Sequence, residues 1–191
     1  MNGMTEKPGR YQRSFAGMLG ALLVLVLGIG VFVVLRDVTR VDPPDPVRPV
    51  DYVQPARFAQ EEARYEVLTP RALPEGWTAT SVRFEPAAEE QSWHVGVLTE
   101  EQRYIGIEQA ERSAEAMVAD FVDEEAREGG EVEIDGRAWR IWTDPGRDPG
   151  ADPSTAPEGD LALVREGGGA TTLVVGTVSQ DDLTGFVESL R

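Results

Sequence analysis

An uninterrupted apolar run is the feature of this 191-residue chain that most restricts what it can become. Residues 15–35 read FAGMLGALLVLVLGIGVFVVL and contain no charged side chain. As a helix rising about 1.5 Å per residue, this run would cover roughly 31 Å, the thickness of the hydrocarbon core of a bilayer. A cleavable signal peptide would be shorter and would end in an A-x-A-like site, whereas RDVTRVDPPDP follows here. We therefore predict a retained transmembrane helix over residues 15–35, in contact with the lipid bilayer.

The residues on either side of this run give the predicted orientation. Three basic side chains lie in the tail at residues 1–14, and three arginines follow the run within residues 36–48, so basic residues alone nearly balance. The tail is short, whereas the far side also carries several aspartates. We predict a single-pass protein of the cell membrane with a cytoplasmic N-terminus and an extracytoplasmic C-terminal domain. Gly17 and Ala21 lie four residues apart, a spacing that would also permit dimerisation through the span.

Composition divides the rest of the chain into a stalk and a folded domain. Residues 36–50 include VDPPDPVRPV, whose four prolines favour an extended, semi-rigid polyproline II conformation. Residues 51–191 alternate apolar patterns with turn signals, and we expect them to form one extracytoplasmic, monomeric domain. The chain has no cysteine, which excludes disulfides, thiolate zinc sites and thiol catalysis.

Charge is distributed unevenly along the chain. Residues 1–40 hold five basic and two acidic side chains, a net of +3, so the chain's net charge of −16 leaves −19 on the other 151 residues. A domain this acidic repels phosphate backbones, and we predict no nucleic-acid binding. A solvated surface explains the charge most simply, while binding of cations or of a basic partner stays open as an alternative.

Hydrophobic periodicity predicts an α+β domain. A short helix is expected at residues 53–64, and amphipathic helices at 113–126 and 179–190. Strands are expected at 77–84, 93–99, 103–109, 161–165 and 171–178, and as a hairpin over 131–143. Strands and helices in this order predict a largely antiparallel sheet with the two amphipathic helices packed on it.

Local signals define the ends of the two amphipathic helices. Ser113 is a candidate N-cap of the first, and Gly129 and Gly130 would end it. Ser179 and Asp182 approximate a capping box at the start of the second. Both helices are therefore predicted from their caps as well as from their apolar stripes.

The hairpin contains a turn signal and two tryptophans. Asp135 and Gly136 suit a two-residue type I′ turn, which would place Val132 opposite Trp139. Trp139 and Trp142 are three residues apart and must face opposite sides of a strand. One of these two tryptophans is expected at an edge or an interface.

The only histidine, His94, lies on a predicted strand within SWHVGVLT. Alternation places Trp93 and Val95 on one face of this strand and His94 and Gly96 on the other. No G-x-S-x-G, Walker A, G-x-G-x-x-G or H-E-x-x-H motif occurs, and no serine is indicated as the partner of a catalytic triad. A zinc site would have to combine His94 with carboxylates alone. We predict a structural histidine and assign no catalytic, cofactor-binding or metal-binding residue.

Carboxylates are abundant but show no arrangement that indicates chemistry. Residues 123–125, which read DEE, are expected to be solvated, and a pair for glycosidic chemistry is recognised by geometry rather than by spacing. Residues 144–160 read DPGRDPGADPSTAPEGD, whose aspartates match neither an EF-hand loop nor a nine-residue calcium repeat. We predict that this segment is a disordered, Pro/Gly-rich insertion.

Several stretches together resemble a known family. They are VRPVDY at 47–52, LPEGW at 73–77, TSVRF at 80–84, WHVGVLT at 93–99, YIGIEQ at 104–109 and W-x-x-W-T at 139–143. With the basic tail containing YQRSFAGML and the single apolar run, they resemble the actinobacterial domain-of-unknown-function 4245 family. The resemblance implies a single-pass protein of the cell envelope, and it implies no activity and no site residues.

These observations favour a membrane-anchored, extracytoplasmic accessory or binding module of the cell envelope. We predict that it is non-enzymatic, that it needs no cofactor and that its partner is an envelope protein or polymer. One alternative is an envelope hydrolase that acts on a glycan or peptide through paired carboxylates. Another is a cation-responsive sensor domain.

Overall fold

The computed structural model describes residues 48–87, 89–148 and 159–191, together with residues 18, 20, 22, 23 and 25–29. The chain divides into two compact units, Met1–Pro46 and Val47–Arg191. The described residues of the first unit are helical. Within the described ranges, no helix is both long enough and apolar enough to cross a membrane. The predicted tail at 1–14, most of the predicted span and stalk residues 36–47 lie outside the described residues.

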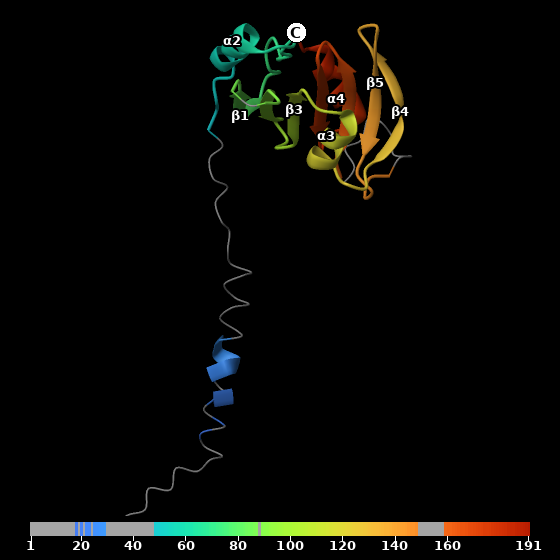
Figure 1. Ribbon diagram of the computed structural model, residues 1–191. Coiled ribbons are helices and arrows are strands. Elements are labelled where there is room, and N and C mark those ends of the chain that lie inside the picture. Colours follow the sequence, from blue (N-terminus) through green and yellow to red (C-terminus); the bar gives the residue numbers. More distant parts are fainter. Residues whose placement is uncertain are drawn as a thin grey trace, which may run out of the picture. The chain divides into compact units, whose positions relative to one another are not determined.

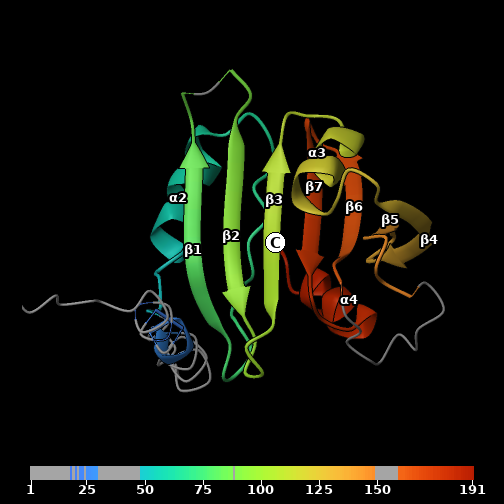
Figure 2. The same ribbon diagram turned by 90° about the horizontal axis from the view of Figure 1, so that it is seen from below.

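The described part of the second unit contains one seven-stranded sheet, in which every pairing is antiparallel (Figures 1 and 2). The strands are β1 (Thr78–Glu85), β2 (Ser92–Leu98), β3 (Tyr104–Ala110), β4 (Arg127–Ile134), β5 (Arg137–Thr143), β6 (Leu161–Gly167) and β7 (Ala170–Gly176). Their order across the sheet is β1-β2-β3-β7-β6-β5-β4. The chain thus forms a three-stranded meander, crosses to the far edge and returns through four strands to pair β7 with β3. The predicted α+β class with an antiparallel sheet is confirmed.

Helices cover the two faces of the sheet differently. We call the face that carries Trp93, Val95 and Val97 the core face, and the face that carries His94, Gly96 and Leu98 the outer face. On the core face, α2 (Val53–Glu62) and α4 (Gln180–Glu188) join the main hydrophobic core. On the outer face, α3 (Ala114–Phe121) packs on β6 and β7. Figure 2 shows α3 in front of β6 and β7 and α2 behind β1.

The outer face therefore has two halves. The covered half is formed by Ala162, Val164, Leu173 and Val175, which pack under α3. The open half is formed by the outer-face residues of β1, β2 and β3, and none of the helices α2, α3 and α4 lies over it (Figure 2). Its residues include Ser81, Arg83, His94, Gly96, Leu98, Tyr104, Gly106 and Glu108.

The helix α3 is shorter than predicted. It begins after its N-cap Ser113, whose side chain accepts from the amide of Ala116, and it ends at Phe121 rather than at 126. The carboxylate of Asp123 accepts from the amide of Glu125, a local bond that competes with continuation of the helix. The predicted terminators, Gly129 and Gly130, lie instead in β4 beside a β-bulge.

The predicted hairpin and the cap of the last helix are confirmed. Asp135 and Gly136 both have positive φ, of 50° and 71°, as a type I′ turn requires, and Val132 lies opposite Trp139. Ser179 caps α4 by accepting from the amide of Asp182. These two features could be predicted from the sequence because each depends only on residues that are neighbours along the chain.

The segment at 144–160, predicted to be a disordered insertion throughout, is folded at both ends. The Asp144 carboxylate accepts from the amides of Gly146, Arg147 and Asp160. Arg147 is only 7% exposed, and its guanidinium donates to the carbonyls of Gly159 and Val178. The predicted bounds of the insertion were therefore too wide, because residues at both of its ends, Asp144, Arg147 and Asp160, belong to the folded domain. Residues 149–158 lie outside the described residues.

Candidate functional site

The two faces of β2 have the residues that alternation predicted. Trp93, Val95 and Val97 are fully buried on the core face, and the indole nitrogen of Trp93 donates to the carbonyl of Leu68 at 3.0 Å. His94 points to the outer face, where its side chain is 17% exposed. The histidine is thus close to solvent although it lies in the middle of a three-stranded meander.

Two hydrogen bonds connect His94 to residues on the neighbouring strands. Its Nε2 lies 2.7 Å from Oγ of Ser81 on β1, and its Nδ1 lies 2.5 Å from Oε1 of Glu108 on β3. Glu108 is 7% exposed, so its carboxylate is largely removed from water. A serine, a histidine and a carboxylate are thereby joined in one row across the open half.

Strand register explains how these three side chains meet. His94 lies directly opposite Glu108 in the pairing of β2 with β3. The pairing of β1 with β2 shifts by one residue between Ala79 and Ser81, which places Ser81 opposite Gly96. Because side chains alternate between faces, Ser81 would point into the core without this bulge. The bulge is therefore what brings the serine hydroxyl to the imidazole.

Two glycines make room above this part of the sheet. Gly96 and Gly106 lie opposite each other on β2 and β3. A Cβ atom on Gly96 would overlap with Oγ of Ser81 and would lie 3.3 Å from the hydroxyl of Tyr104. A Cβ atom on Gly106 would lie 2.6 Å from the same Tyr104 hydroxyl. Both hydroxyl groups occupy space that a side chain at Gly96 or Gly106 would fill.

Tyr104 borders the row and shares its electrostatic environment. Burial raises the pKa of the Tyr104 hydroxyl to about 12, with further contributions from the negative charges of Glu108 and Asp160. The phenol therefore stays protonated at neutral pH. Its hydroxyl makes no hydrogen bond to another described residue. A protonated donor thus lies beside Ser81 and near Glu108.

The structure changes one prediction about chemistry, because it places a serine hydroxyl beside the histidine. No catalytic serine was expected, because the sequence around Ser81 contains no nucleophile motif. The register of β2 with β3 brings Glu108 to the face of His94, and the bulge that adds Ser81 has no signal in the sequence. Among the described residues, no cluster of three or more His, Asp or Glu side chains can hold a metal ion.

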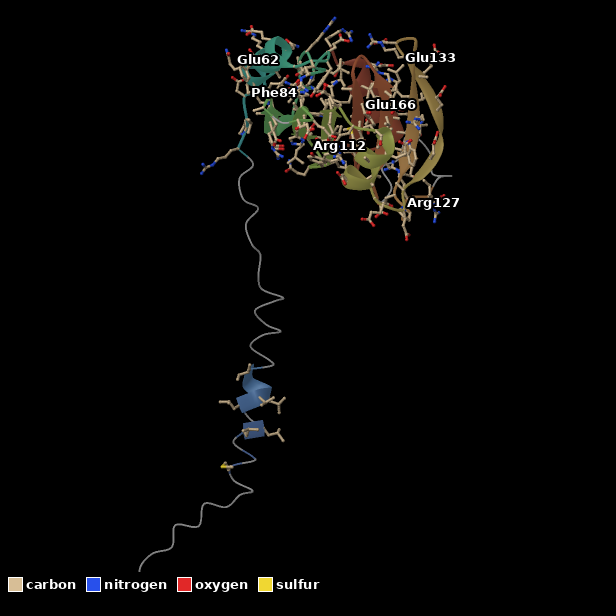
Figure 3. All side chains as sticks on the ribbon, in the orientation of Figure 1. Glu62, Phe84, Arg112, Arg127, Glu133 and Glu166 are labelled. Carbon is tan, nitrogen blue, oxygen red and sulfur yellow. The ribbon has the colours of Figure 1, made fainter. Side chains whose placement is uncertain are left out.

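Several pockets bordered by the described residues lie away from this row. One, of about 260 Å³, lies near the β4–β5 turn and is bordered by Glu66, Arg137 and Arg191 over apolar side chains. Another, of about 430 Å³, is bordered by Arg112 and Glu166, both labelled in Figure 3. Each of these two pockets mixes charges of both signs, and neither contains a nucleophile with a base beside it.

The tryptophans act in packing. Trp139 is buried on the core face and Trp142 packs with the α3 cluster on the outer face, so the predicted opposite orientation is confirmed. The guanidinium of Arg165 lies 5.3 Å from the ring centroid of Trp139, and Arg140 lies 6.0 Å from Trp142. Cations on both rings leave little aromatic surface for stacking on a sugar.

Comparison with known proteins gives a family but no activity. No curated protein sequence matches this chain. One similar solved structure is MucB in complex with MucA(peri), with a TM-score of 0.32 and 15% identity. That similarity covers 65% of this chain and 35% of the MucB chain, so the chain spans about a third of its length. The family model described as protein of unknown function (DUF4245) matches residues 10–190, and the chain therefore belongs to the DUF4245 family.

Proposed function

We propose that this chain is a membrane-anchored accessory module of the cell envelope, with its folded domain outside the cytoplasm. The observation that carries the proposal is the 21-residue apolar run at 15–35, which has the length of a bilayer span and precedes a proline-rich stalk. The compact unit Val47–Arg191 contains its own core, as a domain presented on a stalk must. In this proposal residues 1–14 are the cytoplasmic tail, and the stalk is the part of residues 36–50 that precedes the compact unit, since the amide of Val50 already donates to the carbonyl of Ala79 on β1.

The proposed partner is an envelope protein or polymer with basic groups. The 151 residues after the basic N-terminal part carry a net charge of −19, which favours association with positive surfaces and disfavours phosphate polymers. Acidic residues line the exposed edge strand β4, whose sequence is REGGEVEI. This charge supports recognition of a basic partner rather than an acidic one.

A cysteine-accessibility experiment tests the membrane topology, since the chain has no cysteine of its own. Thr5→Cys places a thiol in the tail, and Glu133→Cys places one on an exposed residue of β4, labelled in Figure 3. A membrane-impermeant maleimide should label Glu133→Cys in intact spheroplasts and Thr5→Cys only after lysis. The unaltered chain is the control for unspecific labelling. The reverse pattern, or equal labelling of both variants before lysis, would refute the topology.

The two other predicted functions have less support. A carboxylate-based hydrolase would need two acids that converge on a substrate, and Asp144 and Asp160 are close neighbours whose burial and mutual repulsion raise the pKa of Asp160. The Asp144 carboxylate is already bound to three backbone amides, including that of Asp160. A cation sensor would draw on the acidic surface and remains a proposal with a simple test, a rise in melting temperature with added calcium.

The prediction of a non-enzymatic module rested on the lack of a recognisable nucleophile. Ser81 is now a candidate, because its hydroxyl lies 2.7 Å from an imidazole nitrogen. An accessory role and a catalytic site on the same domain are compatible, because the proposed tail, span and stalk determine only the location of the domain and not its chemistry.

A further inference from the structure

We propose that Ser81, His94 and Glu108 form an acyl-transfer site that hydrolyses carboxylic esters, an activity that goes beyond the proposed accessory role. The three side chains stand in the order that serine nucleophiles require, a hydroxyl, an imidazole and a carboxylate joined by hydrogen bonds of 2.7 and 2.5 Å. They project from three adjacent strands, so paired backbone rather than a loop holds their positions.

The chemistry of Glu108 determines which imidazole nitrogen carries the proton. An ionised carboxylate only accepts hydrogen bonds, so Nδ1 of His94 must donate to Oε1 of Glu108. The other nitrogen, Nε2, then has a free lone pair directed at the hydroxyl of Ser81. Glu108 is thus a positioning residue that fixes the tautomer, and His94 is the general base.

The row can be reached from outside the domain. Ser81 is partly exposed and the His94 side chain is 17% exposed. None of the helices α2, α3 and α4 lies over the open half, in contrast to the covered half under α3 (Figure 2). A substrate carbonyl can therefore approach the serine from the outer side of the sheet.

Tyr104 supplies a hydrogen-bond donor for the charge that develops on the substrate. The hydroxyls of Ser81 and Tyr104 both lie within 3.3 Å of the position that a Cβ atom on Gly96 would occupy. A carbonyl whose carbon meets Ser81 can thus direct its oxygen to the phenol. The raised pKa of about 12 keeps this phenol protonated and able to donate.

The reaction balances with water as the second substrate. Oγ of Ser81 forms a bond to the ester carbon while Nε2 of His94 takes the hydroxyl proton, and the carbonyl electron pair moves to oxygen beside Tyr104. When that pair returns, the bond to the alkoxy group breaks, and His94 gives the proton to the departing alcohol. A water molecule then attacks the acyl group on Ser81 with His94 again taking a proton, and the carboxylic acid leaves as Ser81 regains its hydrogen.

The donor set favours esters over amides. One phenol stabilises the oxyanion less than the paired donors of proteases, where each donor contributes about 100- to 1,000-fold in rate. An alcohol also departs from the tetrahedral intermediate more readily than an amine. The expected substrates are therefore esters with unhindered acyl groups that an open sheet face can reach.

Covalent labelling of the full-length chain, purified in a mild detergent, tests the nucleophile directly. A fluorophosphonate probe should form a bond to Oγ of Ser81 with loss of fluoride, and peptide mass mapping should find the label at that residue. Ser92→Ala is a matched control, because Ser92 lies on β2 and has no hydrogen bond to the row. It should be labelled at the wild-type rate, whereas Ser81→Ala should not be labelled.

Hydrolysis of p-nitrophenyl acetate tests the assigned roles. Relative to wild type, His94→Gln should lose about 100- to 10,000-fold in kcat/KM, the contribution of a general base. Tyr104→Phe should lose about 100-fold with little change in KM, as expected of a transition-state donor. Glu108→Gln should lower kcat, and Glu108→Asp should recover part of it, which a purely structural role of this carboxylate would not produce.

Two results would overturn the proposal. One is a wild-type chain whose Ser81 is not labelled above the level of heat-denatured protein, a measurement that requires no variant to fold. The other is a Ser81→Ala chain that hydrolyses the ester as fast as wild type. Neither result depends on membrane topology, so the accessory role is tested separately by the cysteine-accessibility experiment.

Discussion

The two halves of the outer face show how one sheet surface can be completed in two ways. In the covered half, aliphatic side chains of β6 and β7 are shielded by Met117 and Val118 of α3. In the open half, the side chains of Ser81, His94 and Glu108 form hydrogen bonds with one another across β1, β2 and β3. A helix is needed where the surface is apolar, whereas a hydrogen-bonded row is stable next to solvent. The hydrogen-bonded row thus lies on the half that α3 leaves uncovered.

Removing the helix contact should break the covered half. Met117 is fully buried between α3 and the sheet, so Met117→Ala should lower the free energy of unfolding by about 2–5 kcal/mol. Urea unfolding followed by tryptophan fluorescence measures this loss, with the exposed neighbour Glu115→Ala as control. A loss below about 1 kcal/mol would mean that α3 contributes little to the covered half.

Adding a methyl group should strain the open half. Gly96→Ala places a Cβ atom against Oγ of Ser81, and overpacking of this kind costs about 1–3 kcal/mol. In a Ser81→Ala background that oxygen is gone, so the same substitution should cost clearly less. A double-mutant cycle on urea unfolding measures the coupling. Equal costs in both backgrounds would show that the serine hydroxyl does not lie over Gly96.

A tyrosine on each face should make the domain sensitive to high pH. Burial, as the main cause, raises the pKa of Tyr65 on the core face and of Tyr104 on the outer face to about 12, from an ordinary value of 10.0. Between these values the unfolded chain releases phenolic protons that the folded chain keeps. Stability is therefore unaffected by these groups below about pH 10 and should fall as the pH rises toward 12.

Variants assign this loss to the two faces. Tyr104→Phe and Tyr65→Phe should each make the fall in urea midpoint above pH 10 less steep. In the double variant, the fall in urea midpoint above pH 10 should be less steep than in either single variant. A slope that Tyr104→Phe leaves unchanged would mean that this phenol is as exposed to water in the folded state as in the unfolded state.

The covered half was more predictable from sequence than the open half. Helix 113–126 and strands 161–165 and 171–178 were recognisable because apolar residues recur at helical or strand spacing. The predicted end of α3 was wrong, because Asp123 forms a local turn that hydrophobic periodicity does not detect. The pairing of β3 with β7 depends on residues about 70 positions apart, as in the register of Ile107 with Val174.

The open half depends on a shift in strand register. Alternation correctly separated Trp93 from His94. The side to which Ser81 points follows from one unpaired position after Ala79, and a bulge in a strand is set by how the strand pairs. The row of three side chains therefore emerges only when β1, β2 and β3 are aligned. A motif search compares residues along the chain, whereas the spatial relation of these three side chains is set by how the strands pair.

The smallest expected effect concerns the histidine in the open half. In His94→Gln the amide can still donate to Glu108 and accept from Ser81, so the free energy of unfolding should fall by only about 0–1.5 kcal/mol, the range for one net hydrogen bond. Urea unfolding of this variant, compared with Ser92→Ala on the same strand, measures the cost. A loss well above 3 kcal/mol would show that the imidazole is part of the packing, as Met117 is. A small loss together with abolished labelling of Ser81 would separate stability from chemistry at the same residue, because the covered half would be intact while the open half had lost its base.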